Sequence, residues 1–221
     1  MLILAPNPCF DATFFVEELV PGSVHRSQKN SYTPGGKGIN VARACKTLGE
    51  KPNLLVMLPR VEGDLYKELL GKDLENVSYQ DINGGVRHAI LINKENSTEN
   101  TVIVGKGPDA TNADWDIFCK HVGELVKPGE IVAEMGSLTP GYPTDALKKL
   151  ADVVHGKGAK LLVDTSPACL KTRGDAIFDF ISPNLDEAEA LINDSSEAVY
   201  IPDATNIEKR ALDAAKKLQN V

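Results

Sequence analysis

Short apolar segments alternate with amphipathic segments along most of this chain. The apolar segments have the length and composition of buried strands, and they cover residues 2–5, 54–58, 131–135, 160–163 and 177–181. The amphipathic segments have the spacing of helices, and they cover residues 38–48, 63–70, 113–126, 144–156, 185–192 and 206–218. Asn112 is the expected N-cap of the helix that begins at residue 113. Strands that alternate with helices indicate parallel βαβ units, so we predict one α/β domain with a layered, mainly parallel sheet.

A glycine-rich loop precedes the first helix of this pattern. Residues 33–44 read Thr-Pro-Gly-Gly-Lys-Gly-Ile-Asn-Val-Ala-Arg-Ala. A helix start has unpaired backbone N–H groups, and glycines let a ligand approach them closely. With Lys37 beside them, the loop suits a phosphorylated or hydroxyl-rich ligand, and the alternative is an ordinary glycine turn before a helix. The loop is not a Walker A motif, because Gly38 rather than Ser or Thr follows Lys37.

The charge of the chain argues against nucleic acid or an anionic membrane as a partner. Its formal net charge is −7 with a pI near 5.2, whereas such partners usually require a basic surface. Cys9, Cys45, Cys119 and Cys169 are too widely spaced for a Cys-x-x-Cys metal pair, so we expect free thiols and no direct metal site. The sequence has neither a signal-peptide core nor an apolar run of membrane-spanning length, and we expect a cytoplasmic protein.

Two segments, residues 13–32 and 86–104, do not follow the alternation. Both are rich in strand-forming residues with polar turns, as in the run Val-Arg-His-Ala-Ile-Leu-Ile over residues 86–92. We expect them to form a small sheet outside the central one. Such a sheet is suited to act as a lid over a site or as a dimer contact, and the remaining alternative is decoration of the domain.

Polar motifs follow three of the predicted strands. Gly136 and Ser137 follow the strand at 131–135, Asp164 ends the strand at 160–163, and Asn184 comes soon after the strand at 177–181. Ligands of parallel α/β sheets bind at the carboxyl ends of the strands. We therefore expect the functional site at this edge of the sheet.

Five motifs, in order along the chain, resemble those of the PfkB (ribokinase-like) family of sugar kinases. They are Asn7-Pro8-Cys9-Phe10-Asp11, the glycine loop at 33–44, Gly-Ser-Leu-Thr-Pro-Gly at 136–141, Val-Asp-Thr-Ser at 163–166 and Pro-Asn-Leu-Asp-Glu at 183–187. The likeness is greatest to the phosphosugar branch, which includes 1-phosphofructokinase, tagatose-6-phosphate kinase and the minor 6-phosphofructokinase. It implies a ribokinase-like α/β/α fold with a small β-lid. It also implies transfer of the ATP γ-phosphoryl group to a hydroxyl of a ketohexose phosphate.

The resemblance further implies a set of substrate-binding residues. They are Asp11, Arg26, Gly35, Gly36, Lys37, Asn40, Arg87 and Ser137. Asp11 is expected to hold sugar hydroxyl groups. Arg26, Lys37 and Arg87 are expected to bind the phosphate that the substrate already carries, a task for which the planar fork of arginine donors is suited. Because Arg26 and Arg87 lie on the two lid segments, closure of the lid would bring them to that phosphate.

The resemblance places Asp164, Asn184 and Glu187 on the side of ATP and Mg²⁺, the two cofactors it implies. Asn184 and Glu187 lie one helical turn apart at a helix start, so their side chains share a face. In the family this pair orders Mg²⁺ through water. The alternative is a helix N-cap followed by an acidic first turn, and both roles can hold together. A homodimer through the lid is a further implication of the resemblance.

The chain departs from the family pattern at several positions. Residues 1–221 contain no Gly-Ala-Gly-Asp motif, whose Asp is the general base of the family and whose N–H groups form its anion hole. The turn at 59–63 keeps only the last glycine of the family's glycine-rich turn, and Glu134 puts a charge into an apolar strand. We expect the N-terminal portion of a sugar-phosphate kinase that is by itself nearly inactive. The alternative is a non-catalytic, kinase-like protein that binds a sugar phosphate or serves in dimerisation.

Overall fold

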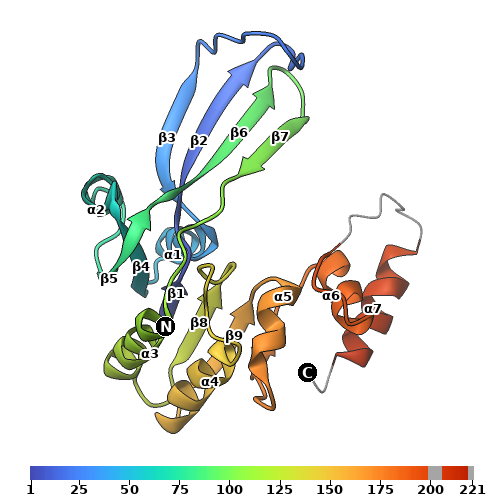
Figure 1. Cartoon of the computed structure of the whole chain (residues 1–221). Helices are drawn as coiled ribbons and strands as arrows, with labels where there is room; N and C mark the ends of the chain where they lie inside the picture. The colour runs from blue at the N-terminus through green and yellow to red at the C-terminus, as the bar shows by residue number, and fades with distance from the viewer. Residues whose placement is uncertain (199–205, 219–221) are drawn as a thin grey trace.

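Two separate sheets organise the molecule (Figure 1). The computed structural model describes residues 1–198 and 206–218, and within these residues six parallel strands form the central sheet. In spatial order they are β10 (Phe180–Ile181), β9 (Lys160–Asp164), β8 (Ile131–Met135), β1 (Leu2–Ala5), β4 (Asn53–Val61) and β5 (Val77–Gly85). The α/β class and the parallel sheet predicted from the alternation are therefore confirmed.

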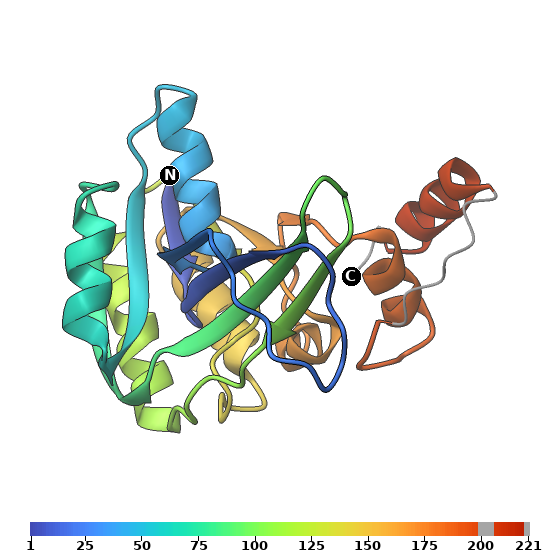
Figure 2. The same cartoon turned by 90° about the horizontal axis from the view of Figure 1, so that it is seen from above.

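Helices cover both faces of the central sheet. On one face lie α1 (Lys37–Thr47) and α2 (Gly63–Gly71), and on the other lie α3 (Asn112–Leu125), α4 (Ala146–Gly156) and the short α5 (Pro167–Leu170), which continues into a 3₁₀ turn at Lys171–Arg173. Beyond β10, α6 (Leu185–Ile192) and α7 (Ile207–Lys217) pack on each other to one side of the domain, as the view from above shows (Figure 2). Over the residues described, no helix combines the length and apolarity needed to cross a bilayer.

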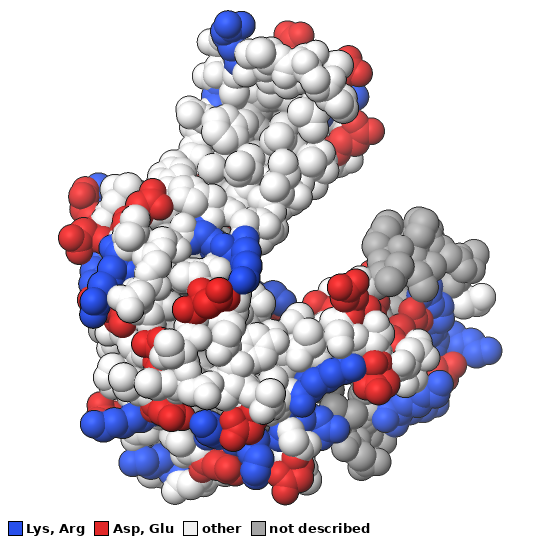
Figure 3. Space-filling model, viewed as in Figure 1, with Lys and Arg blue, Asp and Glu red and all other residues white. Residues whose placement is uncertain are grey.

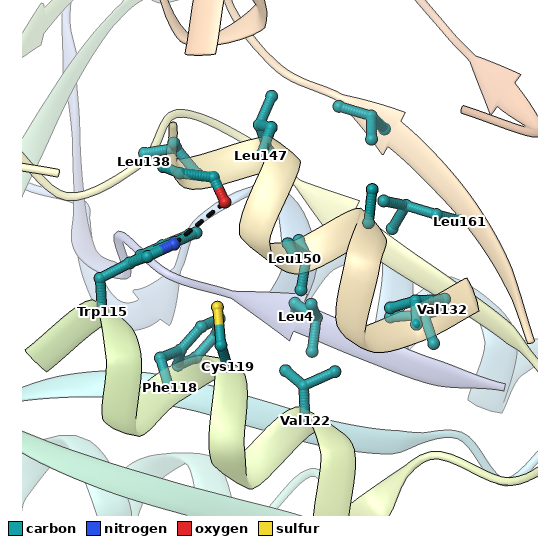
Figure 4. Packing of buried hydrophobic residues seen from close by; sticks show 14 of the residues in the cluster. Leu4, Trp115, Phe118, Cys119, Val122, Val132, Leu138, Leu147, Leu150 and Leu161 are labelled. Carbon is teal, nitrogen blue, oxygen red and sulfur yellow. Dashed lines mark hydrogen bonds between the residues drawn. The ribbon is translucent and has the colours of Figure 1, made fainter. Parts of the chain in front are cut away.

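The core explains why β1 is apolar at every position. Its residues are at most 3% exposed, because the strand is central in the sheet and is covered on both faces. Leu2 and Leu4 face α3 and α4, whereas Ile3 and Ala5 face α1 and α2. Figure 4 shows the first of these clusters, in which the Trp115 indole N–H donates a hydrogen bond of 3.0 Å to the carbonyl oxygen of Ala146.

The structure differs from the sequence prediction at several local points. The strand predicted at 177–181 covers only Phe180–Ile181, and Ile177, counted there as buried, is 72% exposed. Strand β5 was not predicted, because only two of its residues are buried, one of them the polar Gln80, and it ends in Asn-Gly-Gly. The predicted N-cap Asn112 is wrong by one residue. Thr111 is the N-cap of α3, since its hydroxyl accepts a hydrogen bond from the Asp114 backbone N–H while the Asp114 side chain accepts one from the Thr111 N–H.

The small sheet consists of β3 (Asn30–Gly35), β2 (Cys9–Val16), β6 (Arg87–Lys94) and β7 (Asn100–Val104), in that spatial order. Strand β2 pairs antiparallel with β3 and parallel with β6. The segments 13–32 and 86–104 contribute to this sheet, as expected. The sheet begins earlier than the first of these segments, because β2 starts at Cys9. The small sheet projects from the central domain beyond the carboxyl ends of the central strands (Figure 1).

Glu134 is an anomaly within the core. It lies on β8 between Leu4 of β1 and Val163 of β9, its side chain is fully buried, and neither of its carboxyl oxygens has a hydrogen-bond partner. Burial raises the pKa of Glu134 well above its ordinary value, and the nearby Cys169 and Asp164 raise it further while Lys37 opposes them. Burial therefore favours the neutral form of the carboxyl group in the folded protein, because that form avoids the cost of burying an unpaired charge.

This shift predicts how stability depends on pH. In the unfolded chain Glu134 ionises near its ordinary pKa, whereas in the folded chain it stays protonated to a higher pH. Above the unfolded-state pKa, the Glu134 contribution to the free energy of unfolding therefore decreases as pH rises, by up to about 1.4 kcal/mol per pH unit. Glu134→Gln removes this contribution. Urea unfolding between pH 5 and 7 should show the variant gaining stability relative to the wild type, and parallel curves would contradict the assignment.

Candidate functional site

An open cavity of about 530 Å³ lies where the small sheet meets the start of α1. Five of the residues predicted from the sequence line it, and they are Asp11, Gly36, Lys37, Asn40 and Arg87. They come from β2, the turn before α1, α1 itself and β6. Figure 3 shows a wide hollow between the small sheet and the α6–α7 pair, so a ligand has access between the two parts of the molecule.

Asp11 lies directly over Gly35. The two residues sit on neighbouring strands, and a Cβ atom added to Gly35 would overlap the Asp11 carboxylate. The Cys9 thiol donates a hydrogen bond of 3.3 Å to Asp11 Oδ1. Burial, together with the negative charge of Asp11, raises the pKa of Cys9 to about 12. Cys9 is therefore a neutral thiol that supports Asp11, and it is unsuited to act as a nucleophile.

Arg87 is held by the turn that links the two sheets. Its Nε and Nη2 atoms donate to the carbonyl oxygen of Asn7 at 3.2 and 2.8 Å. The Asn7 side chain donates in turn to the Ser137 hydroxyl at 3.1 Å and to the carbonyl oxygen of Leu138 at 3.2 Å. Asn7 thus connects Arg87 of the small sheet with Ser137, which follows β8 in the central domain. Its neighbour Gly107 has no side chain, and a Cβ there would collide with Asn7 Oδ1.

Lys37 forms an ion pair with Asp164 at the end of β9. The Nζ–Oδ1 distance is 2.7 Å, and the Asp164 side chain is 18% exposed against 44% for Lys37. The end of β9 is also held to the turn after β8, since Gly136, at φ 99°, donates its N–H to the Asp164 carbonyl oxygen at 2.7 Å. The carboxylate therefore fixes the direction of an ammonium group that remains accessible from the cavity.

The first turn of α1 is an anion-binding feature of the same cavity. Gly36 is the N-cap at φ 109°, no side chain caps its N–H groups, and the first turn has no acidic residue. The helix dipole and the unpaired N–H groups favour a negative group at this position. Asn40, one turn further on, accepts a hydrogen bond of 3.2 Å from Arg43 Nη1. The cavity therefore combines a carboxylate with two cationic side chains and a helix N-terminus.

A model of the pfkB family of carbohydrate kinases matches residues 6–221. The chain belongs to the PfkB family. The match spans nearly the whole sequence and includes every residue of the cavity, so the resemblance seen in the motifs is confirmed.

Crystal structures of related proteins share the fold of this PfkB chain. Phosphofructokinase-2 from Escherichia coli in complex with substrates and products is 24% identical, with a TM-score of 0.82 over 98% of this chain and 69% of that one. A protein from Thermotoga maritima described as a possible 1-phosphofructokinase is 25% identical, with a TM-score of 0.77 over 98% of this chain and 68% of that one. The PfkB chain thus spans about two thirds of the length of these proteins.

Arg26 does not line the cavity of the PfkB chain, so its predicted contact with the phosphate on closure of the lid stays a prediction. It is exposed and lines a different cavity with Phe15, His25 and Glu95. The reason is the antiparallel pairing of β2 with β3. Cys9 pairs with Gly35 beside the site, so the connection at residues 17–29, which carries Arg26, is at the remote end of the hairpin.

Asn184 and Glu187 form a capping box at the start of α6. Asn184 Oδ1 accepts a hydrogen bond from the Glu187 N–H, and Glu187 Oε2 accepts one from the Asn184 N–H, both at 2.9 Å. These two bonds use one oxygen of each side chain. In residues 1–198 and 206–218, no group of three or more His, Cys, Asp or Glu side chains is arranged to hold a metal ion directly. The capping alternative is therefore observed, and it leaves room for contact with a hydrated ion.

Asn7 belongs to the first of the five sequence motifs, which by itself predicts no role for it. Its contacts reach residues about 80 and 130 positions away, and a linear pattern does not reveal such pairs. The only local signal is an asparagine between Pro6 and Pro8, directly after a buried strand. The two prolines restrict the backbone on both sides of Asn7. A rigid backbone helps one residue to keep hydrogen bonds to both the small sheet and the central domain.

Gly35→Ala tests the packing of the site. The added methyl group overlaps the Asp11 carboxylate, so the substitution should lower the free energy of unfolding by about 1–3 kcal/mol. The loss should be smaller in a chain that also carries Asp11→Ala, because the overlap is then absent. Gly71→Ala is the control, since nothing lies within 4 Å of its added Cβ. Urea unfolding of all four variants measures the effect, and equal losses in both backgrounds would contradict the close approach.

Proposed function

We propose that this chain binds a phosphorylated ketohexose and presents one of its hydroxyl groups for phosphoryl transfer from ATP. The single observation that supports this most strongly is the mixed character of the cavity. Asp11 is an acceptor for hydroxyl groups, whereas Lys37, Arg87 and the start of α1 attract an anion. A ligand that carries both hydroxyl groups and a phosphate matches all of these groups at once.

The surrounding residues support a division of roles. Asp11 accepts from two sugar hydroxyls, and Gly35 and Gly36 allow the sugar to approach the backbone. Arg87 and Lys37 bind the phosphate, with Arg87 supplying two N–H donors in a plane. Ser137 and Asn40 add hydroxyl and amide contacts around the rim of the cavity. In this assignment the reaction is that of a 1-phosphofructokinase, tagatose-6-phosphate kinase or minor 6-phosphofructokinase.

ATP and Mg²⁺ are the cofactors of the proposed reaction. Asn184 and Glu187 would hold Mg²⁺ through its water molecules, because the capping box keeps two of their oxygens in fixed positions on one helix face. Asp164, which orients Lys37, ends β9, and α6 begins soon after the neighbouring strand β10. The ion would supply charge neutralisation between the phosphates of ATP.

We expect the 221 residues by themselves to bind substrate without efficient turnover. Phosphoryl transfer requires a base and preorganised N–H donors at the developing charge, and this sequence contains no Gly-Ala-Gly-Asp motif to provide them. Binding is therefore the sharper test. Robust ATP turnover by this polypeptide would contradict the expectation of inactivity, but it would support the kinase assignment.

Arg87→Ala tests the phosphate contact. Calorimetry should show binding of at least one of fructose 6-phosphate, fructose 1-phosphate and tagatose 6-phosphate, and much weaker binding of fructose. Removal of Arg87 should weaken the phosphosugar affinity by about 10- to 100-fold, the usual range for a hydrogen-bonded charge. The matched control is Arg173→Ala, because the Arg173 guanidinium donates to the Ala176 carbonyl oxygen at 3.5 Å and does not line the cavity. If none of the three phosphosugars binds the wild-type chain, the proposal is wrong.

We also propose that two copies associate through their small sheets. Strand β7 is at the edge of the small sheet, and Val102, Ile103 and Val104 are 50–58% exposed. Figure 3 shows that the broad visible face of this sheet is almost free of charged side chains. Exposed apolar surface of this kind is typical of protein–protein contacts, and an uncovered edge strand favours pairing with another chain.

Ile103→Lys tests this association. Ile103 is in the exposed edge strand β7, so a charge there should shift the protein towards monomer, by about tenfold or more in the dimer dissociation constant. Ile117→Lys is the matched control, because Ile117 is similarly exposed but lies on α3, away from the small sheet. Sedimentation velocity over a range of concentrations measures both. A wild-type chain that remains monomeric at high concentration would contradict the proposal.

A further inference from the structure

The small sheet is not joined to the central sheet by a hydrogen-bonded ladder. The chain passes between them four times, through residues 6–8, Gly36, Val86 and 105–111. These connections are rich in glycine and proline, and Gly36 and the nearby Gly84 have φ values above 100°. Side-chain contacts must therefore contribute to fixing the angle between the two sheets.

The two faces of the small sheet have different tasks. Side chains alternate between the faces along a strand, so Cys9, Asp11 and Arg87 lie on the face that lines the cavity. Phe10, Tyr32 and His88 lie on the opposite face. The Phe10 and Tyr32 rings stack with centroids 4.4 Å apart, and the Phe10 ring meets the buried Tyr66 of α2 edge-on at 5.2 Å.

Glu62 reaches this opposite face from the central domain. It precedes α2 at φ 65°, a left-handed conformation that is uncommon for a residue with a side chain, and its carboxylate does not cap the helix. Instead, Glu62 Oε2 lies 3.1 Å from His88 Nε2, and the other ring nitrogen of His88 lies 3.4 Å from the Tyr32 hydroxyl. Partial burial, the charge of Glu62 and a hydrogen bond to it raise the pKa of Tyr32 to about 12.

We propose that Glu62 is a positioning residue for Arg87. By holding His88 and Tyr32, it fixes the face of the small sheet that is remote from the cavity against the start of α2. Arg87 is the neighbour of His88 on β6, so this contact places the Arg87 guanidinium over the cavity. A strained backbone at residue 62 persists because the carboxylate is used in this contact. The inference rests on the proposed function, since it assigns Arg87 to the phosphate of the substrate.

Glu62→Gly is the decisive variant, because it removes the carboxylate and also relieves the left-handed strain. The fold should therefore be kept or stabilised, while the affinity for fructose 6-phosphate, or whichever phosphosugar binds the wild type, should fall about tenfold. In an Arg87→Ala background the same change should have almost no further effect, because its influence passes through Arg87. The matched control is His155→Ala, since His155 and Asp179 form a similar pair at 3.0 Å away from the small sheet.

Hydrogen exchange provides a readout that needs no ligand. The Val86 N–H donates to the Val61 carbonyl at 3.3 Å, directly at the connection between β5 and β6. Peptides that cover residues 83–90 should exchange faster in Glu62→Gly and at the wild-type rate in His155→Ala. Unchanged exchange in Glu62→Gly overturns the inference, whether or not a phosphosugar binds. Failure of all three phosphosugars to bind the wild-type chain is a different result, and it refutes the proposed function. Faster exchange with unchanged phosphosugar affinity overturns it as well.

Discussion

The close approach of α1 to the end of β1 decides where the site can form. A Cβ atom on Gly38 would lie 2.9 Å from both Ala5 Cβ and the Leu4 carbonyl oxygen, so only glycine allows the helix to begin this close to the sheet. Gly36, at φ 109°, then turns the chain from β3 into α1 within one residue. As a result, the unpaired N–H groups of the helix lie at the carboxyl edge of the central sheet, beside the strands that carry Asp11 and Arg87.

Most of the architecture could be predicted from the sequence, because the residues that form the core recur with the periodicity of helices and strands. The helices at 113–126 and 185–192 were predicted to within one residue of their observed bounds, since each has an apolar stripe and clear end signals. Strand β5 was missed because it lies at the edge of the sheet and only part of it is buried. Strand propensity and hydrophobic periodicity reflect the burial of one face of an element. An edge strand buries fewer residues, so its periodicity is weak.

The site was predicted less completely for a different reason. Residues near the glycine loop were identified by motif, and the structure brings five of them into one cavity. The place of Arg26 could not be read from the motif, because the length and pairing of the β2–β3 hairpin put it at the end remote from the cavity, and its contact with the phosphate stays a prediction. Asn7 and Glu62 received no role because each acts on a residue of another element, and their importance depends on three-dimensional neighbours.

The Lys37–Asp164 pair shows how the cavity can be both preorganised and available. An exposed ion pair contributes little to stability, about 0–1 kcal/mol, so the fold alone gives little reason for this arrangement. Its effect is to hold a long, flexible side chain in one direction before any ligand arrives, which lowers the entropy that binding must overcome. An ammonium group has three donors, and the bond to Asp164 uses one of them. Lys37 can therefore bind a phosphate oxygen without giving up the carboxylate that orients it.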